Sequence, residues 1–465
     1  MSAIKELSPE QKEAMREYAA GSNIFLTGPG GSGKTELIKR MVEYSQSQGK
    51  KVQVCALTGC AAVLLNCKAK TLHSWAGIGI AAGNNSDIIK KVLGNKYKKN
   101  NWTSIDILII DEVSMMSLKL FDLLDSLGRE VKKKAQMPFG GLQIICSGDF
   151  YQLPPVGNTP ETSAFCFESA NWTATFPVVI QLKTIFRQTD MSYTKILNQL
   201  RIGKLYKSSL DTLMQQVNKV MQTTFRPTIL LPRRKDADLI NASEMAKLTG
   251  ATKTYKVTRA QESDLAVIQP GQKWKKTAPQ ASASAGEKTT ELQNDMEYTF
   301  LINNIMADAE LVLKVGAQVM CIANIDSGIV VQPEEALSNQ NSEINKTIVN
   351  GSQGIVVDFL RDLPVVQFTN GAKRVIGTHL WASETNPAVG VKQIPLIHAW
   401  AITIHKSQGV TLEMAQIDAG SNIFECGQTY VALSRVKSLE GLYLTALNPQ
   451  KIRVNAKVQQ FYGSL

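Results

Sequence analysis

The sequence has few of the residues that build disulfide or metal frameworks. Its 465 residues include seven cysteines, an odd number without a CxxC pair, and four scattered histidines. These counts exclude a disulfide-stapled scaffold and a zinc ribbon, and they indicate a reducing compartment. No stretch approaches the roughly 20 consecutive apolar residues that a membrane-spanning helix needs. We therefore expect a soluble, intracellular protein with no membrane partner.

Acidic residues are also scarce relative to basic ones. The chain has 40 aspartates and glutamates against 51 lysines and arginines, a formal net charge of +11. This excess favours a polyanionic partner, although solubility alone could account for it. The N-terminal run MSAIKELSPEQKEAM has a charged helical pattern, unlike an apolar signal peptide. We expect a cytoplasmic or nucleoid-associated protein, and a viral or phage origin stays open.

The first part of the chain alternates strand-like and helix-like runs, which predicts an α/β fold with a parallel sheet. Apolar strand patterns end in polar residues at 23–27, 52–58, 105–111 and 142–147. Such strands deliver polar side chains to one edge of a parallel sheet. We place this first domain at residues 1–190. Within it, residues 77–102 are rich in Gly, Asn and Lys, and they predict an exposed hairpin or loop insert.

A second α/β domain is predicted for residues 191–465. Its strand patterns lie at 228–232, 415–418 and 441–447, and residues 273–291 have a loop composition. Short β-like runs with Gly-rich turns fill residues 311–391. They predict a small, SH3-like β-barrel inserted into the second domain.

A phosphate-binding loop follows the first strand and precedes a helix. The eight residues match G-x-x-x-x-G-K-[ST] in full: Gly28, Pro29, Gly30, Gly31, Ser32, Gly33, Lys34 and Thr35. Glycines let backbone N–H groups surround phosphate oxygens at the start of a helix. Lys34 is expected to reach the β- and γ-phosphates of ATP, and the hydroxyl of Thr35 to hold Mg²⁺.

Two further strands end in polar residues suited to hydrolysis. Asp111 and Glu112 follow an apolar strand, so one carboxylate can complete the Mg²⁺ shell and Glu112 can orient or deprotonate the attacking water. Gln152, in the run SGDFYQLPP, can sense the γ-phosphate without carrying charge. Arg187 and Arg435 can stabilise transition-state charge, although either arginine alone could equally form a surface ion pair.

The motifs together resemble those of the PIF-type helicases of superfamily 1, with related Dda-like and RecD-like motors. The resemblance rests on GPGGSGKT, ALTGCAA, KTLHSWAGIG, LIIDEVSMM, SGDFYQLPPV, IFRQ, VNGSQGIVVDF, AITIHKSQGVTLE and YVALSRVKSLEGL, in that order along nearly the whole chain. It implies two RecA-like motor domains that bind ATP between them. It also implies translocation from 5′ to 3′ along single-stranded DNA, with unwinding of the duplex. The insert at residues 77–102 falls where members of the family carry the strand-separating hairpin.

The resemblance also assigns residues that the patterns alone do not. Gln11 falls where the family reads adenine, and Gly409 lies in the segment that couples ATP to DNA. The implied DNA contacts are Thr58, Gly59, His73, Trp75, Thr403 and His405. Hydroxyls and amides suit phosphates, and an aromatic ring can stack on a base. Trp75 could equally belong to the core, and His73 could make a structural hydrogen bond.

Three functions stay open at this point. The leading one is an ATP-dependent DNA helicase acting as a monomer on single-stranded and forked DNA, with replication or repair proteins as partners and roles in replication, repair or recombination. The second is a translocase that strips proteins from DNA with little unwinding. The third is a nucleic-acid-binding module that ATP switches. The complete set of hydrolysis residues argues against the third, because a binding module does not need it.

Overall fold

The computed structural model describes residues 7–465 except 66, 68, 80, 82, 189, 221–225, 262, 265–293, 296, 300, 303–304, 324, 326–347 and 384–388. The chain folds into two compact units. Unit 1 comprises residues 1–221, 230–232 and 403–465, and unit 2 comprises residues 222–229 and 233–402. The predicted loop at 273–291 lies outside the described residues.

Unit 1 contains a six-stranded sheet, and its paired strands all run parallel, which confirms the predicted α/β class. The strand order is β3-β2-β4-β5-β1-β6. The strands are β1 (Ile24–Thr27), β2 (Val52–Ala56), β3 (Lys70–Thr71), β4 (Ile107–Asp111), β5 (Gln143–Gly148) and β6 (Val178–Gln181). Parallel pairing brings all their carboxyl ends to one edge, where polar side chains gather.

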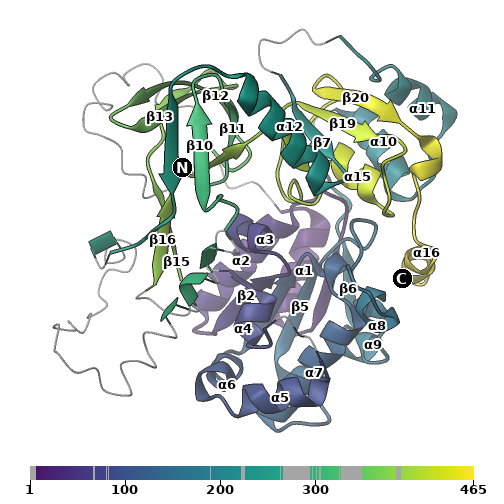
Figure 1. The fold of residues 1–465 in the computed structure, drawn as a ribbon. Coiled ribbons are helices and arrows are strands. Elements are labelled where there is room, and N and C mark those ends of the chain that lie inside the picture. The colour runs from purple at the N-terminus through teal and green to yellow at the C-terminus, as the bar shows by residue number, and fades with distance from the viewer. Residues whose placement is uncertain are drawn as a thin grey trace, which may run out of the picture. The chain divides into compact units, whose positions relative to one another are not determined.

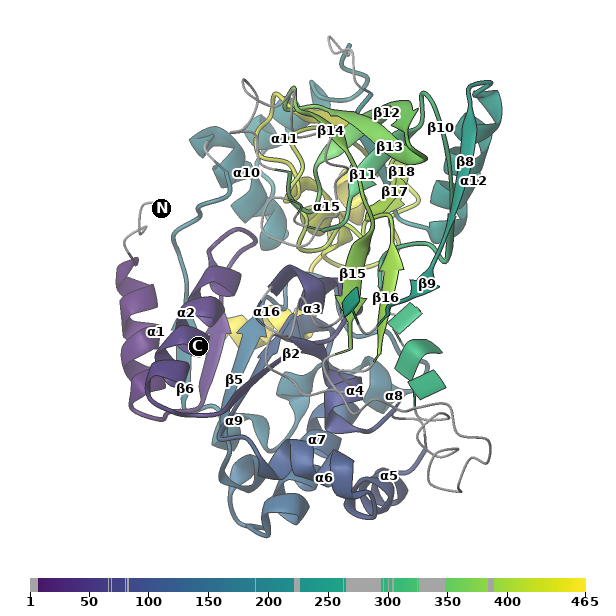
Figure 2. The ribbon, with the colours of Figure 1, turned by 90° about the vertical axis from the view of Figure 1, so that its left-hand side faces the viewer.

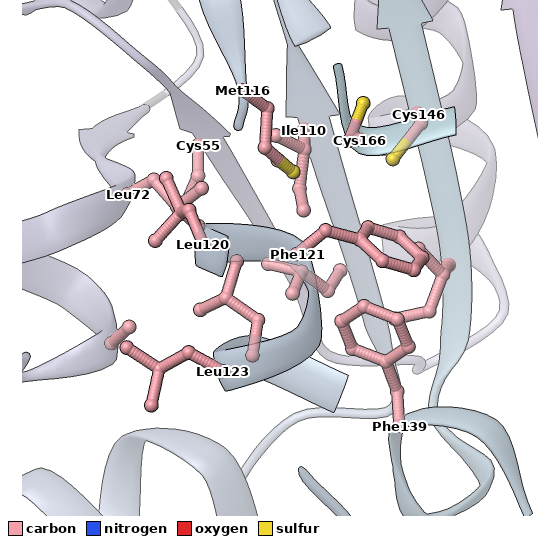
Figure 3. Packing of buried hydrophobic residues seen from close by; sticks show 14 of the residues in the cluster. Cys55, Leu72, Ile110, Met116, Leu120, Phe121, Leu123, Phe139, Cys146 and Cys166 are labelled. Atoms are coloured by element: carbon pink, nitrogen blue, oxygen red, sulfur yellow. The ribbon is translucent and has the colours of Figure 1, made fainter. Parts of the chain in front are cut away.

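The sheet is buried on both faces, because alternate residues of each strand enter two different cores. On β4, Ile107 and Ile109 join one core, whereas Leu108 and Ile110 join the other. Such strands are hydrophobic throughout, as expected for a parallel sheet covered by helices. Figure 3 shows Ile110 on the second face, in the same cluster as Phe121 and Phe139.

Helices cover each face. One core includes side chains from α1 (Pro9–Ala19), α2 (Lys34–Ser47) and α3 (Gly59–Leu65). The other core includes side chains from five helices, which lie near one another in Figure 1. They are α4 (Leu72–Ala76), α5 (Asn85–Leu93), α6 (Lys96–Thr103), α7 (Leu118–Lys132) and α9 (Trp172–Thr175). The short helix α8 (Pro160–Ser163) lies between β5 and α9 in the chain.

The later part of unit 1 adds a second group of elements. Strands β19 (Ala415–Ala419) and β20 (Leu442–Leu447) pair in parallel. The helices are α10 (Met191–Arg201), α11 (Lys207–Met214), α15 (Gln428–Leu433) and α16 (Ala456–Gly463). The chain crosses between the units at β7 (Thr228–Leu231) and next to β18 (Ala401–Thr403).

The insert at 77–102 is not the exposed hairpin or loop expected from its composition. It forms the helices α5 and α6, and both views show them beside α7 (Figures 1 and 2). Asparagines that suggested a loop are N-caps instead: Asn95 accepts hydrogen bonds from the backbone N–H groups of Tyr97 and Lys98 at 3.0 and 3.1 Å. Ile88 and Val92, one turn apart, are buried in the core.

Unit 2 is β-rich, as predicted for residues 311–391. A five-stranded antiparallel sheet has the order β14-β13-β12-β11-β17. Its strands are β11 (Gln318–Cys321), β12 (Gln353–Leu360), β13 (Leu363–Phe368), β14 (Lys373–Val375) and β17 (Leu396–His398). Leu311 and Leu313 of β10 (Glu310–Lys314) share a core with this sheet. Strand β10 pairs with β8 (Thr252–Lys256).

A second small sheet in unit 2 has the order β15-β16-β9. Figure 2 shows β15 (His379–Ala382) and β16 (Gly390–Gln393) as an antiparallel pair, and β9 (Thr258–Arg259) completes the sheet. The helix α12 (Arg234–Lys247) precedes β8 in the chain. Within the described ranges, no helix combines the length and apolar character that crossing a membrane requires.

Trp102 is the residue of the α5–α6 insert that we expect to contribute most to stability. It is 0% exposed, its ring lies 4.8 Å from that of Trp75, and its indole N–H donates to the carbonyl of Ala76. Trp102→Ala is expected to lower the free energy of unfolding by about 3–5 kcal/mol because it opens a large cavity. Thermal melts should show the loss. Tyr97→Ala, at a position 79% exposed, is the control and should change stability by less than about 0.5 kcal/mol.

Candidate functional site

The phosphate-binding loop joins β1 to α2, as the sequence predicted. Gly31 and Gly33 both have φ of +83°, a backbone conformation that favours glycine. A Cβ at Gly31 would lie 2.5 Å from the Cβ of Arg187, so that position also lacks space. The ammonium of Lys34 donates to the carbonyl oxygens of Gly28 at 2.7 Å and Pro29 at 3.1 Å. The side chain of Lys34 therefore folds back on the start of the loop and is held there by two carbonyl oxygens.

Gln11 lies beside this loop. Its side chain is part of the capping box of α1, in which Oε1 accepts from the backbone N–H of Ser8 at 3.1 Å. A Cβ added to Gly33 would meet Nε2 of Gln11 at 2.8 Å. Gln11 is 4% exposed. The capping box fixes the glutamine against the loop, at a position consistent with contact to a bound nucleotide.

The carboxylates of Asp111 and Glu112 stand at the end of β4. Burial, reinforced by the neighbouring charge of Glu112, raises the pKa of Asp111 to about 6. Burial lowers the pKa of Lys34, while the nearby carboxylates of Asp149, Glu112 and Asp111 act in the opposite direction. Lys34 therefore lies close to these carboxylates, which favour the charged form of the lysine.

Asp149 follows β5 and forms a buried ion pair that sequence reasoning missed. Its carboxylate accepts two hydrogen bonds from Arg201 of α10, at 2.8 and 2.9 Å. Asp149 is 0% exposed, and the ion pair raises the pKa of Arg201 further. The guanidinium lies 4.6 Å from the ring centre of Tyr151, which stacks on Tyr462 of α16 at 4.6 Å. Because a broken buried pair leaves an uncompensated charge, this network fixes the segment after β5.

The hydroxyl of Tyr462 ties the same network to β1. It lies 2.6 Å from Oγ1 of Thr27, the residue directly before the phosphate-binding loop, and it accepts from the backbone N–H of Phe150 at 3.2 Å. Gln152, three residues after Asp149, is 5% exposed. The expected γ-phosphate sensor therefore belongs to a segment held by α10 and α16.

Arg435 is buried and Arg187 is half-buried, and within the described residues neither forms the surface ion pair that the sequence left open. Arg435 follows α15, is 2% exposed, and donates to the carbonyl of Val431 and to Oγ of Ser434, each at 2.9 Å. Burial and the nearby Arg187 lower the pKa of Arg435 to about 9. Throughout the described ranges of the chain, neither arginine has a carboxylate within ion-pair distance.

The end of α15 is held by residues that follow β6. The carbonyl of Ser434 accepts from Arg187 and from Gln188, each at 3.2 Å, and the hydroxyl of Tyr193 donates to the carbonyl of Leu433. These donors satisfy carbonyls that a helix end leaves unpaired. On the same helix, the hydroxyl of Tyr430 accepts from the backbone N–H of Gly30 at 2.9 Å. Helix α15 therefore contacts the phosphate-binding loop directly.

A buried hydroxyl in the loop fits a phosphate ligand. Ser32 is 1% exposed, and its Oγ has no hydrogen-bond partner among the described residues. A buried polar group without a partner costs free energy, which a phosphate oxygen would recover. Two unpaired arginines and Lys34 supply positive charge around it. The hydroxyl of Thr35 and the carboxylate of Asp111 are oxygen ligands of the kind that Mg²⁺ prefers.

The residues expected to touch DNA lie in two regions of unit 1. Thr58 and Gly59 stand at the start of α3, where Oγ1 of Thr58 accepts from the backbone N–H of Ala61 at 3.2 Å. His73 on α4 is half-buried, and burial lowers its pKa. Thr403 accepts from the backbone N–H of Lys406 at 3.1 Å. These hydroxyls already stabilise local turns.

Trp75 belongs to the hydrophobic core and is not a surface for stacking of DNA bases. It is 1% exposed and packs against Trp102, so its ring has no free face on which a base could stack. His405 differs, because it is half-buried and its ring stacks on that of Phe424 at 6.5 Å. Phe424 is 50% exposed. The aromatic surface near these candidate contacts is thus His405 and Phe424, and the sequence analysis did not single out Phe424.

The segment that contains Gly409 contacts the carboxylate of Glu112. Gly409 has φ of +81°, and the preceding Gln408 donates through Nε2 to Oε2 of Glu112 at 2.9 Å. Gln408 was noted in the sequence only as part of HKSQG. Its contact with Glu112, 296 positions away in the chain, has no signal in the sequence.

Comparisons with known proteins agree with this geometry. A family model described as PIF1-like helicase matches residues 6–209. The ATP-dependent DNA helicase PIF1 of Danio rerio is 33% identical over 467 residues, covering 99% of this chain and 64% of the relative. The crystal structure of Pif1 helicase from Candida albicans is 31% identical, with a TM-score of 0.73, and the match covers 99% of this chain and 100% of that one. The chain belongs to the PIF1-like helicase family.

A further PIF1-like structure carries ligands. Pif1 helicase from Bacteroides, in complex with ADP-AlF3 and single-stranded DNA, is 27% identical with a TM-score of 0.63, and the match covers 99% of this chain and 97% of that one. This chain spans about two-thirds of the length of the curated PIF1 relatives, 64% in the case of the Danio rerio protein.

Lys34 provides the direct test of the nucleotide site in this PIF1-like chain. Lys34→Ala is expected to reduce ATP turnover by at least about 10²–10³-fold, because it removes a cation that stabilises phosphate charge. Affinity for single-stranded DNA should stay close to that of the unmodified protein, since those contacts lie elsewhere. Lys39→Ala, on the same helix α2, is the control and should keep full turnover. Near-normal hydrolysis by Lys34→Ala, measured by phosphate release, would rule out this loop as the ATP site.

Proposed function

We propose that this chain is an ATP-dependent DNA helicase that moves from 5′ to 3′ on single-stranded DNA and unwinds duplexes. The observation that carries the proposal is the buried Arg435 and the half-buried Arg187, neither of them in an ion pair within the described residues, beside a complete phosphate-binding loop. Two cations without a carboxylate partner are expensive to bury unless an anion joins them. A triphosphate supplies that anion, and its hydrolysis develops the charge that such arginines stabilise.

Each polar group of the site has a role in this chemistry. The loop amides and Lys34 bind the β- and γ-phosphates, and Gln11 reads the adenine. Thr35 and Asp111 hold Mg²⁺, which neutralises phosphate charge when bound. Glu112 orients or deprotonates the attacking water.

Three segments make turnover depend on the rest of the chain. Gln152 senses the γ-phosphate, and Arg187 and Arg435 stabilise the charge of the transition state. Gly409 lies in the turn that would report nucleotide state to DNA. Because Arg435 and Gly409 come from the C-terminal part of unit 1, hydrolysis requires this part to stay packed on the first sheet.

The DNA proposal rests on the family and on the positions of Thr58, Gly59, His73, Thr403 and His405. The Bacteroides relative binds single-stranded DNA, and the net charge of +11 favours the same ligand here. Hydroxyls and backbone amides at helix and turn starts suit phosphate contacts. We expect forked DNA as the substrate and replication or repair proteins as partners of a monomeric motor.

The architecture that we propose follows the family as well. Residues 1–190 and 191–465 would form two RecA-like domains, with the β-rich residues 311–391 as an SH3-like barrel. The helices α5 and α6 carry exposed lysines, among them Lys90, Lys91 and Lys96. Such a basic insert suits contact with the duplex at a fork.

Unwinding of tailed duplexes tests this proposal. A duplex with a 5′ single-stranded tail should be opened in the presence of ATP and Mg²⁺, whereas a duplex with a 3′ tail should not. Labelled-strand release measures both, and Lys34→Ala is the inactive control. Opening of 3′-tailed duplexes alone would contradict the polarity. DNA-stimulated ATP hydrolysis without opening of either substrate would instead indicate a translocase.

A further inference from the structure

Glu112 accepts a hydrogen bond from a glutamine that the ATPase roles above do not use. Nε2 of Gln408 lies 2.9 Å from Oε2 of Glu112. Gln408 is 8% exposed and Glu112 is half-buried, so the contact is partly shielded from water. A hydrogen bond to a carboxylate is stronger than one between neutral groups, and shielding strengthens it further. One oxygen of Glu112 is thereby fixed in direction.

The backbone of Glu112 is restrained as well. Its φ is 56° and its ψ is 40°, the left-handed region that residues with a side chain seldom adopt. A residue keeps this conformation only where its surroundings hold it. The 3₁₀ turn Val113–Met115 follows directly, and the backbone N–H of Met115 donates to the carbonyl of Glu112 at 3.2 Å. The backbone and the side chain of Glu112 are therefore held by separate contacts.

Gln408 belongs to a turn whose residues are joined by hydrogen bonds. The backbone N–H of Ser407 donates to the carbonyl of Thr403 at 3.0 Å, and the backbone N–H of Gln408 donates to the carbonyl of His405 at 3.2 Å. Oγ of Ser407 donates to the carbonyl of Ile404 at 2.8 Å. These bonds link Thr403 and His405 to Gln408, so we expect a displacement of either residue to shift the side chain of Gln408.

From this geometry we propose that Gln408 is a positioning residue for Glu112. Its amide holds one carboxylate oxygen and leaves the other to accept a hydrogen bond from the attacking water. Because Gln408 sits in the 403–409 turn, occupancy of Thr403 and His405 by DNA sets the direction of Glu112. The inference rests on the proposed function, in which Glu112 activates water and these two residues contact DNA.

Gln408→Met and Gln408→Glu test the proposal, since both keep the approximate shape and remove the donor. Each should reduce the turnover number of ssDNA-stimulated ATP hydrolysis by about 10- to 100-fold. Gln408→Glu should be the more severe, because it places a second negative charge against Glu112. The KM for ATP, the affinity for single-stranded DNA and the thermal midpoint should stay near those of the unmodified protein. Gln459→Met, at an exposed position on α16, is the matched control.

A double-mutant cycle with Glu112→Gln separates positioning from a structural role. If Gln408 acts through Glu112, Gln408→Met should cost little further turnover once Glu112→Gln is present. Additive losses, a change confined to KM, or full DNA stimulation in Gln408→Met would overturn the positioning role while leaving the proposed function intact. An unmodified protein whose ATP turnover does not respond to single-stranded DNA would overturn both.

Discussion

Arg435 is buried and lies close to the half-buried Arg187, and neither has a carboxylate within ion-pair distance in the described part of the chain. A buried cation is costly, and a second one beside it raises that cost. The side chains of both arginines are nevertheless fixed by hydrogen bonds. The carbonyl of Ser434 binds Arg187, and Tyr193 and Gln188 fix the end of α15. These contacts hold two positive charges close together near the carboxylate of Glu112, and an anionic ligand would compensate them further.

The Asp149–Arg201 pair shows the opposite arrangement within the same unit. There the charges are matched, bidentate and stacked on Tyr151 and Tyr462, so no ligand is needed. This pair fixes the segment that carries Gln152 and connects it to β1 through Thr27. The Asp149–Arg201 pair is therefore neutral by itself and supports the neighbouring site of Arg187 and Arg435, which has no carboxylate within ion-pair distance among the residues that the structure describes. Binding sites of this kind need a rigid supporting structure.

Much of this could be predicted from the sequence, and the failures have physical causes. Strand periodicity and the phosphate-binding motif are local, so β1, β4, β5 and the loop at Gly28–Thr35 were found. The insert was misread because asparagines suit helix caps as well as loops, and Trp75 was ambiguous because burial depends on Trp102, 27 residues away. Two contacts join segments that are distant in the sequence: the ion pair of Arg201 with Asp149, and the hydrogen bond of Gln408 with Glu112. A single sequence carries no signal for such pairings.

The most direct test of this account is the thermal stability of Arg435→Met with and without nucleotide. If the buried arginine is retained for the phosphates and not for the fold, the variant without nucleotide should melt no lower than the unmodified protein. The upward shift on adding ADP, aluminium fluoride and Mg²⁺ should then be much smaller than in the unmodified protein, because ligand stabilisation follows affinity. A variant that melts well below the unmodified protein yet keeps the full ligand-induced shift would contradict the account.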